Sequence, residues 1–207
     1  ASSLIGSHRE QARAALENLL ENPPNDTVKK KARQALDQLA QFEDYITAWQ
    51  VAGPYSAKGK SGPALHDVAF PPEEPNAKGV EWKVMPPGGG EKRFYPFVMD
   101  LYRRFKRENS VAYLRTWVWS PAEQKARLEF GSDDGAKVWL NGQLVLNVPK
   151  PRSFQPAEDK VIVTLKQGWN PLLVKVWNGG LYWSAALRLR APDGARLEGL
   201  KASVEPR

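Results

Sequence analysis

The first part of the chain has hydrophobic residues at every third or fourth position, which is the spacing of an amphipathic α-helix. Over 7–22 these positions are alanines and leucines, and Ser7 followed by Glu10 forms a capping box at the predicted start. The stretch 22–25, Asn-Pro-Pro-Asn, ends this helix, and a second helical pattern covers 28–46. The pattern predicts a helical hairpin with one apolar face. Because two helices cannot bury such a face alone, it either docks on the next domain or continues a helical repeat array.

From Trp49 onward the hydrophobic pattern changes to alternation, the period of a β-strand. The alternating runs are short and are separated by turn sequences such as SDDG, NG and NGG, with no helical pattern between them. This spacing predicts an antiparallel β-sandwich rather than a parallel α/β sheet. Residues 56–79, rich in proline, glycine, lysine and glutamate, are predicted to form a long loop. We therefore expect two domains, a helical hairpin over 1–47 and a mainly β domain over 48–207. The strongest predicted strands are 110–120, 125–132, 136–148, 160–165, 170–178 and 183–191.

Alternation separates two faces on three of these strands. One face is aliphatic, with residues such as Leu114, Val138 and Val174, and we predict that it forms the core between two sheets. The opposite face combines tryptophan with lysine or arginine, and its members are Tyr113, Arg115, Trp117, Trp119, Lys137, Trp139, Leu173, Lys175 and Trp177. Two explanations fit such a face. It is a platform for carbohydrate, since indole rings stack on the C–H faces of sugars, or it is covered by the helical hairpin.

The stretch Ser132–Gly135 places two adjacent carboxylates, Asp133 and Asp134, between two predicted strands. Asp-Gly is a strong signal for a tight turn, because aspartate bonds its own backbone and glycine tolerates positive φ. Clustered carboxylates and loop carbonyls are also the ligands that Ca²⁺ prefers. The sequence leaves both interpretations open, a turn alone or a turn that holds Ca²⁺ or a ligand. A catalytic dyad is not indicated, because adjacent residues in a turn rarely approach one bond from opposite sides.

Composition and charge narrow the function classes. Lysine and arginine number 30 against 23 acidic residues, which gives a net charge of +7. Two explanations fit this surplus: a polyanionic partner (nucleic acid, a sulfated or uronic polysaccharide, or an anionic surface), or general solubility alone. The absence of cysteine excludes disulfides and thiolate chemistry, and no apolar run is long enough to span a membrane. His8 and His66 lack the spacing of a zinc site, and neither a GxSxG nor a P-loop motif occurs. We therefore expect no enzymatic activity. The basic run 103–107 is interpreted first as a solvated edge and second as a contact for an anionic glycan, because no nucleic-acid-binding signature surrounds it.

Two longer motifs resemble a known group of proteins. VWLNG over 138–142 and LKQGWNPLLVKV over 165–176 resemble the sugar-binding domain of family-2 glycoside hydrolases, within the galactose-binding-like jelly-roll superfamily. The SDDG stretch is similar to PA14 lectin-like domains, some of which bind Ca²⁺ and a glycan through an aspartate pair. The resemblance covers roughly 48–195 and implies a jelly-roll sandwich, as in accessory modules of large secreted bacterial proteins. It carries ligand residues over only at Asp133 and Asp134.

These observations together predict a non-catalytic carbohydrate-binding module of a larger protein that is secreted, periplasmic or exposed at the cell surface. The expected partners are a polysaccharide, including acidic ones, and other domains of the same polypeptide, but not nucleic acid. Two alternatives stay open: a structural interdomain or assembly module whose tryptophans are packed, and a glycan-active enzyme domain. The predicted site combines aromatic stacking, one cation, and an acidic pair that holds hydroxyls or Ca²⁺; its residues are Trp177, Tyr182, Trp183, Arg152, Asp133 and Asp134.

Overall fold

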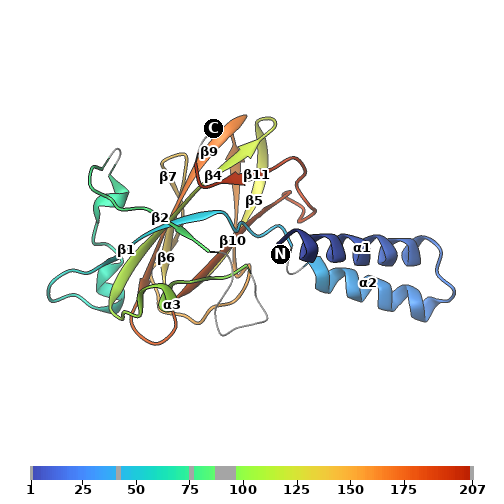
Figure 1. Ribbon diagram of the computed structural model, residues 1–207, viewed down its shortest axis with the longest axis horizontal. Helices are drawn as coiled ribbons and strands as arrows, with labels where there is room; N and C mark the ends of the chain where they lie inside the picture. The colour runs from blue at the N-terminus through green and yellow to red at the C-terminus, as the bar shows by residue number, and fades with distance from the viewer. Residues whose placement is uncertain (1, 41–42, 75–76, 87–96, 206–207) are drawn as a thin grey trace. The chain divides into compact units, whose positions relative to one another are not determined.

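The chain forms two compact units, residues 1–43 and residues 44–207 (Figure 1). The computed structural model describes residues 2–40, 43–74, 77–86 and 97–205, with side chains described from residue 11. Its helices are α1 (Ser2–Glu21), α2 (Asp26–Ala40) and α3 (Leu101–Phe105), together with the short 3₁₀ helices η1 (Gly62–Leu65) and η2 (Pro71–Glu73). Its strands are β1 (Trp49–Tyr55), β2 (Lys83–Met85), β3 (Met99–Asp100), β4 (Ser110–Ser120), β5 (Gln124–Asp133), β6 (Ala136–Leu140), β7 (Gln143–Val148), β8 (Asp159–Leu165), β9 (Gly168–Asn178), β10 (Ser184–Arg190) and β11 (Lys201–Ser203).

The first unit is the predicted helical hairpin of α1 and α2, with different helix ends. Helix α1 begins at Ser2, so Ser7 lies inside the helix and does not cap it. The Asn25 side chain accepts a hydrogen bond from the backbone of Val28 (2.9 Å) and caps α2. Helix α2 ends at Ala40, before the predicted end at residue 46; residues 41–42 of the predicted helix lie outside the described residues. No helix in the described part of the chain is both long and apolar enough to cross a membrane.

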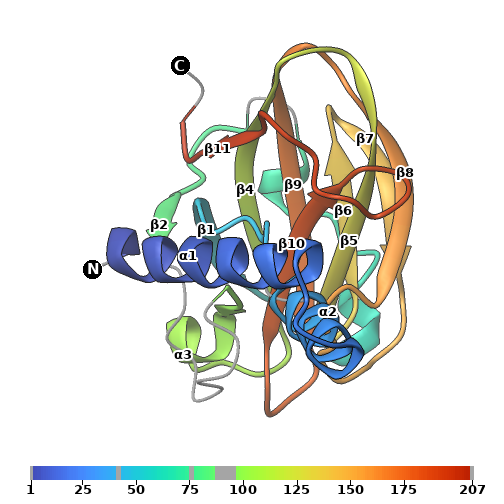
Figure 2. The same ribbon diagram turned by 90° about the vertical axis from the view of Figure 1, so that its right-hand side faces the viewer.

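The second unit is an antiparallel β-sandwich, as the sequence predicts. Its larger sheet has the strand order β2-β1-β4-β9-β6-β7, with β11 also paired to β4, and its smaller sheet has the order β3-β10-β5-β8. Strands β4, β9 and β6 run side by side at the centre of the larger sheet (Figure 2). Residues 136–148 form a hairpin of two strands, as the Asn-Gly turn signal predicts, and Asn141 and Gly142 both adopt positive φ angles in the turn between them. Six basic and six acidic residues balance in unit 1–43, so the sandwich unit carries the whole net charge of +7.

The core lies between the two sheets and follows the predicted alternation. Leu114, Val138 and Val174 point inward from the larger sheet, and Leu128 and Leu187 meet them from the smaller sheet. All five side chains are buried. The prediction that the aliphatic face forms the core is confirmed.

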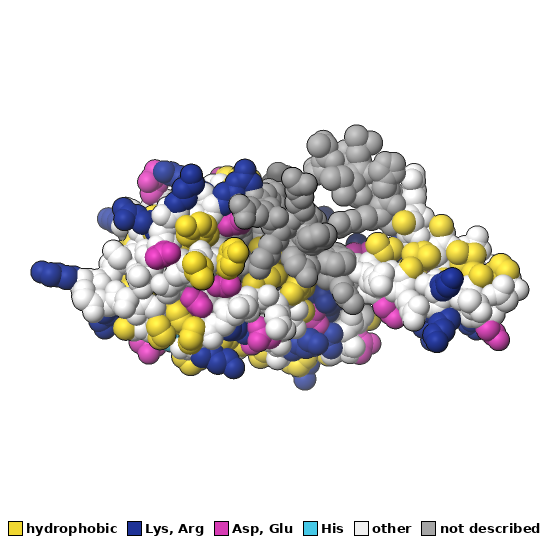
Figure 3. Space-filling view, turned by 90° about the horizontal axis from the view of Figure 1, so that it is seen from below, with side chains coloured by type: hydrophobic (Ala, Val, Ile, Leu, Met, Phe, Trp, Pro, Cys, Tyr) yellow, Lys and Arg dark blue, Asp and Glu magenta, His cyan; other side chains and the backbone are white. Residues whose placement is uncertain are grey.

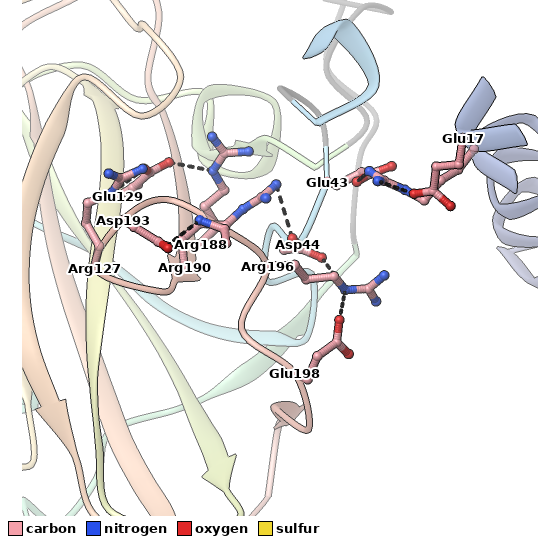
Figure 4. Close-up of polar contacts among 12 residues, drawn as sticks. Glu17, Glu43, Asp44, Arg127, Glu129, Arg188, Arg190, Asp193, Arg196 and Glu198 are labelled. Atoms are coloured by element: carbon pink, nitrogen blue, oxygen red, sulfur yellow. Dashed lines mark hydrogen bonds and ion pairs between the residues drawn. The ribbon is translucent and has the colours of Figure 1, made fainter. Parts of the chain in front are cut away.

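Ion pairs cover the outer face of the smaller sheet. The buried Glu129 carboxylate accepts hydrogen bonds from Arg127 (2.8 Å) and Arg188 (2.7 Å), and Asp44 forms ion pairs with Arg190 and Arg196 (Figure 4). Burial raises the pKa of Glu129, but its bonds to the two arginines outweigh this and lower the pKa below its ordinary value. Charged side chains on this face therefore mostly bind one another.

A segment of the sandwich unit itself covers half of the larger sheet's outer face. The segment 56–74, teal in Figure 1, follows β1 and contains η1 and η2. Its Leu65 packs on the outward side chains of Val111, Tyr113 and Trp177 in a second hydrophobic cluster, with each of the four side chains fully buried. This half of the tryptophan face is therefore covered, but its cover is the segment 56–74 and not the helical hairpin that the sequence-based alternative named.

His66 links this segment to two strands of the sheet. The indole Nε1 of Trp177 donates to His66 Nδ1 (3.1 Å), and His66 Nε2 lies 2.7 Å from Asn147 Oδ1. Because an indole N–H only donates, Nδ1 must accept, and the proton of the neutral ring belongs on Nε2. Burial lowers the pKa of His66; the bond to Asn147 opposes this effect, and the nearby charges of Lys137, Asp67 and Lys175 act in both directions.

The arrangement predicts a loss of stability in mild acid. Because the pKa of His66 is lower in the folded protein than its ordinary value of 6.5, its contribution is complete above that pH and declines as the pH falls below it. Thermal unfolding measured between pH 7.5 and 5 should show a falling Tm, with about 2–4 °C for each kcal/mol lost. The His66→Gln variant, which cannot titrate, should start from a lower Tm and show a flatter profile over the same range. Parallel profiles for the two proteins would contradict the assignment.

Candidate functional site

The uncovered half of the larger sheet's outer face forms a groove with a volume of about 560 Å³. Its floor comes from β4, β9 and β6, and its wall comes from the end of the covering segment and from residues 77–82. We call it the tryptophan groove, because three half-buried tryptophans line it together with a cation and two carboxylates: Trp82, Trp117, Trp139, Arg115, Glu73 and Glu74.

Strand register explains how these side chains meet. Arg115 on β4 is level with Leu173 on β9, which is level with Trp139 on β6. Trp117 is level with Pro171 in the adjacent row, because outward-facing residues recur every second position along a strand. The floor therefore carries one indole ring on each side of β9, Trp117 on β4 and Trp139 on β6. The apolar side chains of Pro171 and Leu173 lie between them.

Arg115 is the cation of the groove. Its guanidinium carbon lies 4.1 Å from the centre of the Trp82 ring and 5.2 Å from that of Trp117, and its Nε donates to Gln50 Oε1 (2.6 Å). Among the described residues, no hydrogen bond or ion pair uses its terminal Nη groups. Burial lowers the pKa of Arg115, but a guanidinium keeps its proton in proteins. The groove thus holds a fixed positive charge with several donors available to a ligand.

The acidic wall is fixed by a buried lysine. Lys175 is fully buried, and its ammonium donates to Glu73 Oε1 (2.8 Å) and to the carbonyl of Val68 (2.6 Å). The hydroxyl of Tyr113 also donates to Glu73. Burial and this carboxylate both raise the pKa of Tyr113, which keeps its hydroxyl protonated as a donor. Glu73 is therefore held in place, while the neighbouring Glu74 is exposed at the wall.

Two of the predicted stacking residues are buried, and this part of the prediction is wrong. Trp177 is 0% exposed beneath the covering segment. Trp183 is 1% exposed in the main core and packs against Phe105 with ring centres 5.6 Å apart. Neither indole presents a ring face to a ligand. Tyr182, the third predicted stacking residue, is 60% exposed at one end of the sandwich and does not line the tryptophan groove.

The predicted contact of Arg152 with a ligand is also corrected. Its side chain is 7% exposed and forms ion pairs with Asp159 (2.6 Å) and Glu158 (3.3 Å). The same guanidinium donates to the hydroxyl of Ser132 (2.9 Å). Arg152 therefore holds the loop before β8 against the end of β5.

Asp133 is the last residue of β5 and Asp134 begins the connection to β6, and the peptide bond between them is cis. The Asp134 carboxylate accepts hydrogen bonds from the backbone of Gly179 (2.8 Å) and of Arg152 (3.3 Å), one on each oxygen. Asp133 is buried. The structure thus brings Asp134, Arg152 and the strand end at Trp177 together, but it joins them to one another rather than around an open site.

The contacts of this acidic pair are those of a structured turn. Hard-cation sites in proteins need six to eight oxygen ligands, and the described residues contain no group of three or more carboxylate or histidine side chains placed to hold a metal. Both oxygens of Asp134 already accept backbone N–H groups, and the nearby cation is the Arg152 guanidinium. The geometry supports the turn interpretation.

We predict that Asp134 contributes stability without a metal. The Asp134→Ala variant leaves two backbone donors without their acceptor and should lose about 2 kcal/mol of unfolding free energy. The exposed Glu123→Ala is a matched control that should change little. The Tm of the wild-type protein should be the same in EDTA and in millimolar CaCl₂, since a cation bound to the folded state would raise it. A calcium-dependent rise abolished by Asp134→Ala would contradict this prediction.

Sequence reasoning placed Arg115, Trp117 and Trp139 on one face but did not select them as site residues, and it missed Trp82 and the glutamate wall. The signal for the first three was the alternation itself. Trp82 and Glu73 gave none, because they lie in or beside a segment without periodicity and meet the sheet only through tertiary contacts.

No protein-family model matches the sequence, and no curated protein matches it. Several solved structures are similar in fold. The PA14 domain of the MpAFP antifreeze protein is 15% identical, with 77% of this chain and 73% of that chain covered and a TM-score of 0.39. A family 35 carbohydrate-binding module from an environmental isolate is 15% identical, with 46% and 72% covered and a TM-score of 0.35. A GH2 beta-galacturonidase from Eisenbergiella tayi, bound to galacturonate, is 16% identical, with 70% of this chain but 25% of that chain covered and a TM-score of 0.40. These structures include the PA14 and GH2 groups that the sequence motifs resemble.

Proposed function

We propose that the sandwich unit is a non-catalytic carbohydrate-binding module whose ligand lies in the tryptophan groove. The observation that carries the proposal is the convergence of three half-buried indoles from three segments, Trp82, Trp117 and Trp139, on one groove. An indole ring is costly to leave in water, and these three lie outside both hydrophobic clusters or at their margins. Sugar C–H faces offer the apolar surface that such rings stack on, and Arg115 and Glu74 offer polar contacts to hydroxyls.

The distribution of acidic groups supports binding rather than hydrolysis. Glycoside hydrolysis needs two carboxylates that flank the scissile bond. The acidic side chains that line the groove, Glu73 and Glu74, are adjacent in sequence and belong to one wall, and Glu73 is already bound to Lys175 and Tyr113. The groove floor between the indoles carries apolar residues and Arg115.

The proposal includes a preference for acidic polysaccharides. The Nη groups of Arg115 face no protein acceptor among the described residues, and a planar guanidinium matches a carboxylate with two parallel hydrogen bonds. The sandwich unit also carries the net charge of +7, which attracts a polyanion. Membership of a larger secreted protein remains a prediction of the sequence resemblance.

Affinity electrophoresis in gels that contain a polysaccharide tests the groove. The Trp117→Ala and Trp139→Ala variants should each bind at least about tenfold more weakly, since an aromatic ring buries a large apolar area. Trp169→Ala is the matched control, because this half-buried indole packs on Trp119 away from the groove. Retention of none of the neutral and acidic polysaccharides by the wild-type protein would contradict the proposal, and so would an equal loss in the control.

The preference for acidic sugars has its own test. Arg115→Lys keeps the charge but loses the planar fork, so binding to polygalacturonate should weaken by about tenfold while binding to a neutral polysaccharide changes less. Lys125→Gln removes one exposed charge from the smaller sheet and serves as the control. Equal effects of Arg115→Lys on acidic and neutral polysaccharides would show that Arg115 supports the groove without selecting a carboxylate.

A further inference from the structure

One end of the sandwich carries an apolar tip beside a cluster of basic side chains. The tip is the connection between β9 and β10, in which Leu181 is 74% exposed and Tyr182 is 60% exposed. The basic cluster lies on α3 and the turn after it, where Arg103, Arg104, Lys106 and Arg107 are all exposed. We call the two parts together the end patch.

Backbone hydrogen bonds hold the two parts of the end patch against each other. The amides of Leu101 and Tyr102 both donate to the carbonyl of Trp183 (2.9 and 3.1 Å), and Tyr102 is itself 40% exposed. The amide of Leu181 lies 3.4 Å from the carboxylate of Glu108. Figure 3 looks onto this end and shows hydrophobic side chains gathered on it, with lysine and arginine side chains around them and acidic side chains between.

The four basic side chains have no acidic partner within the described residues. No ion pair involves Arg103, Arg104, Lys106 or Arg107, although Arg104 lies over the ring of Phe105. The nearest acidic residues in the chain have other roles: Asp100 caps α3 by accepting from the Arg103 backbone, and Glu108 faces the Leu181 amide. The end patch therefore has an excess of positive charge, in contrast to the paired charges on the smaller sheet.

The exposed leucine is not explained by the turn. Leu181 has φ of 61°, a left-handed conformation that glycine or asparagine adopts at lower cost. An aliphatic side chain at such a tip also offers nothing to a base or a sugar ring for stacking. Leucine and tyrosine next to arginines are the combination that enters the boundary of a lipid bilayer, with apolar groups among the acyl chains and cations at anionic headgroups.

We propose that the end patch docks the sandwich on an anionic lipid bilayer. Leu181, Tyr182 and Tyr102 enter the headgroup boundary, and the four basic side chains contact lipid phosphates. The site is separate from the tryptophan groove, whose lining includes none of these residues. A protein docked in this way would keep the groove available to a polysaccharide.

Sedimentation of the full chain with vesicles tests this proposal. Vesicles of phosphatidylcholine with one-third phosphatidylglycerol should carry the protein down, and vesicles of phosphatidylcholine alone should not. Replacing Arg103 and Arg104 by glutamine should weaken the partition at least about tenfold, because each basic residue near the surface contributes a factor of about five. Leu181→Ser combined with Tyr182→Ser changes no charge and should weaken it to a similar extent.

The controls separate lipid docking from the other possibilities. Lys125→Gln combined with Lys160→Gln removes two exposed charges from the smaller sheet and should leave sedimentation unchanged, as should Trp117→Ala in the groove. Circular dichroism should show that every variant is folded, since the changed side chains are exposed or, for Trp117, half-buried outside the core. Sedimentation that survives Leu181→Ser with Tyr182→Ser, and is matched by equal retention on heparin, would mean a polyanion site and would overturn the proposal. Absence of sedimentation with anionic vesicles would overturn it as well.

Discussion

The arrangement on the outer face of the larger sheet depends on one buried charge. Lys175 lies on the central strand β9 with its ammonium fully buried, and an unpaired ammonium in such a place would cost several kcal/mol. Glu73 and the carbonyl of Val68 supply the partners, and both belong to the segment that follows β1. The segment must therefore lie on the sheet, and in doing so it covers Trp177 and sets Glu73 at the edge of the tryptophan groove. Cover and groove are two results of the same ion pair.

The sequence was sufficient to predict the sandwich and its core because alternation is a local property. Leu114, Val138 and Val174 each point inward for a reason that their own strand contains. The outer face was different, since Trp139 and Trp177 both follow a lysine and a valine in sequence. They differ because the segment 56–74, about a hundred residues before Trp177, covers Trp177 but not Trp139. That segment has no hydrophobic periodicity from which its position could be predicted.

The same limit explains both the residues that were wrongly predicted to contact a ligand and those that were missed. Arg152 and Asp134 have side chains of the kind that bind ligands, but both are used within the protein. Asp134 accepts from the backbone of Arg152, and the Arg152 guanidinium pairs with Asp159. A sequence does not show that a charge is already paired. Trp82 carries no sequence signal, because its ring lies against the guanidinium of Arg115 on β4 only in the folded chain. Whether a polar group is available to a ligand depends on partners that it meets only in the folded chain.

The floor and the wall of the groove come from parts of the protein that tolerate change to different degrees. Its floor belongs to β4, β9 and β6, where each outward residue backs onto a core residue, so a change of strand length or register there would disturb the whole sandwich. Its wall belongs to a connection whose ends are fixed by β1 and β2 but whose course past Glu73 is free to lengthen, shorten or exchange side chains. A change of sequence in this connection would therefore reshape one side of the groove and leave the sheet beneath it unchanged.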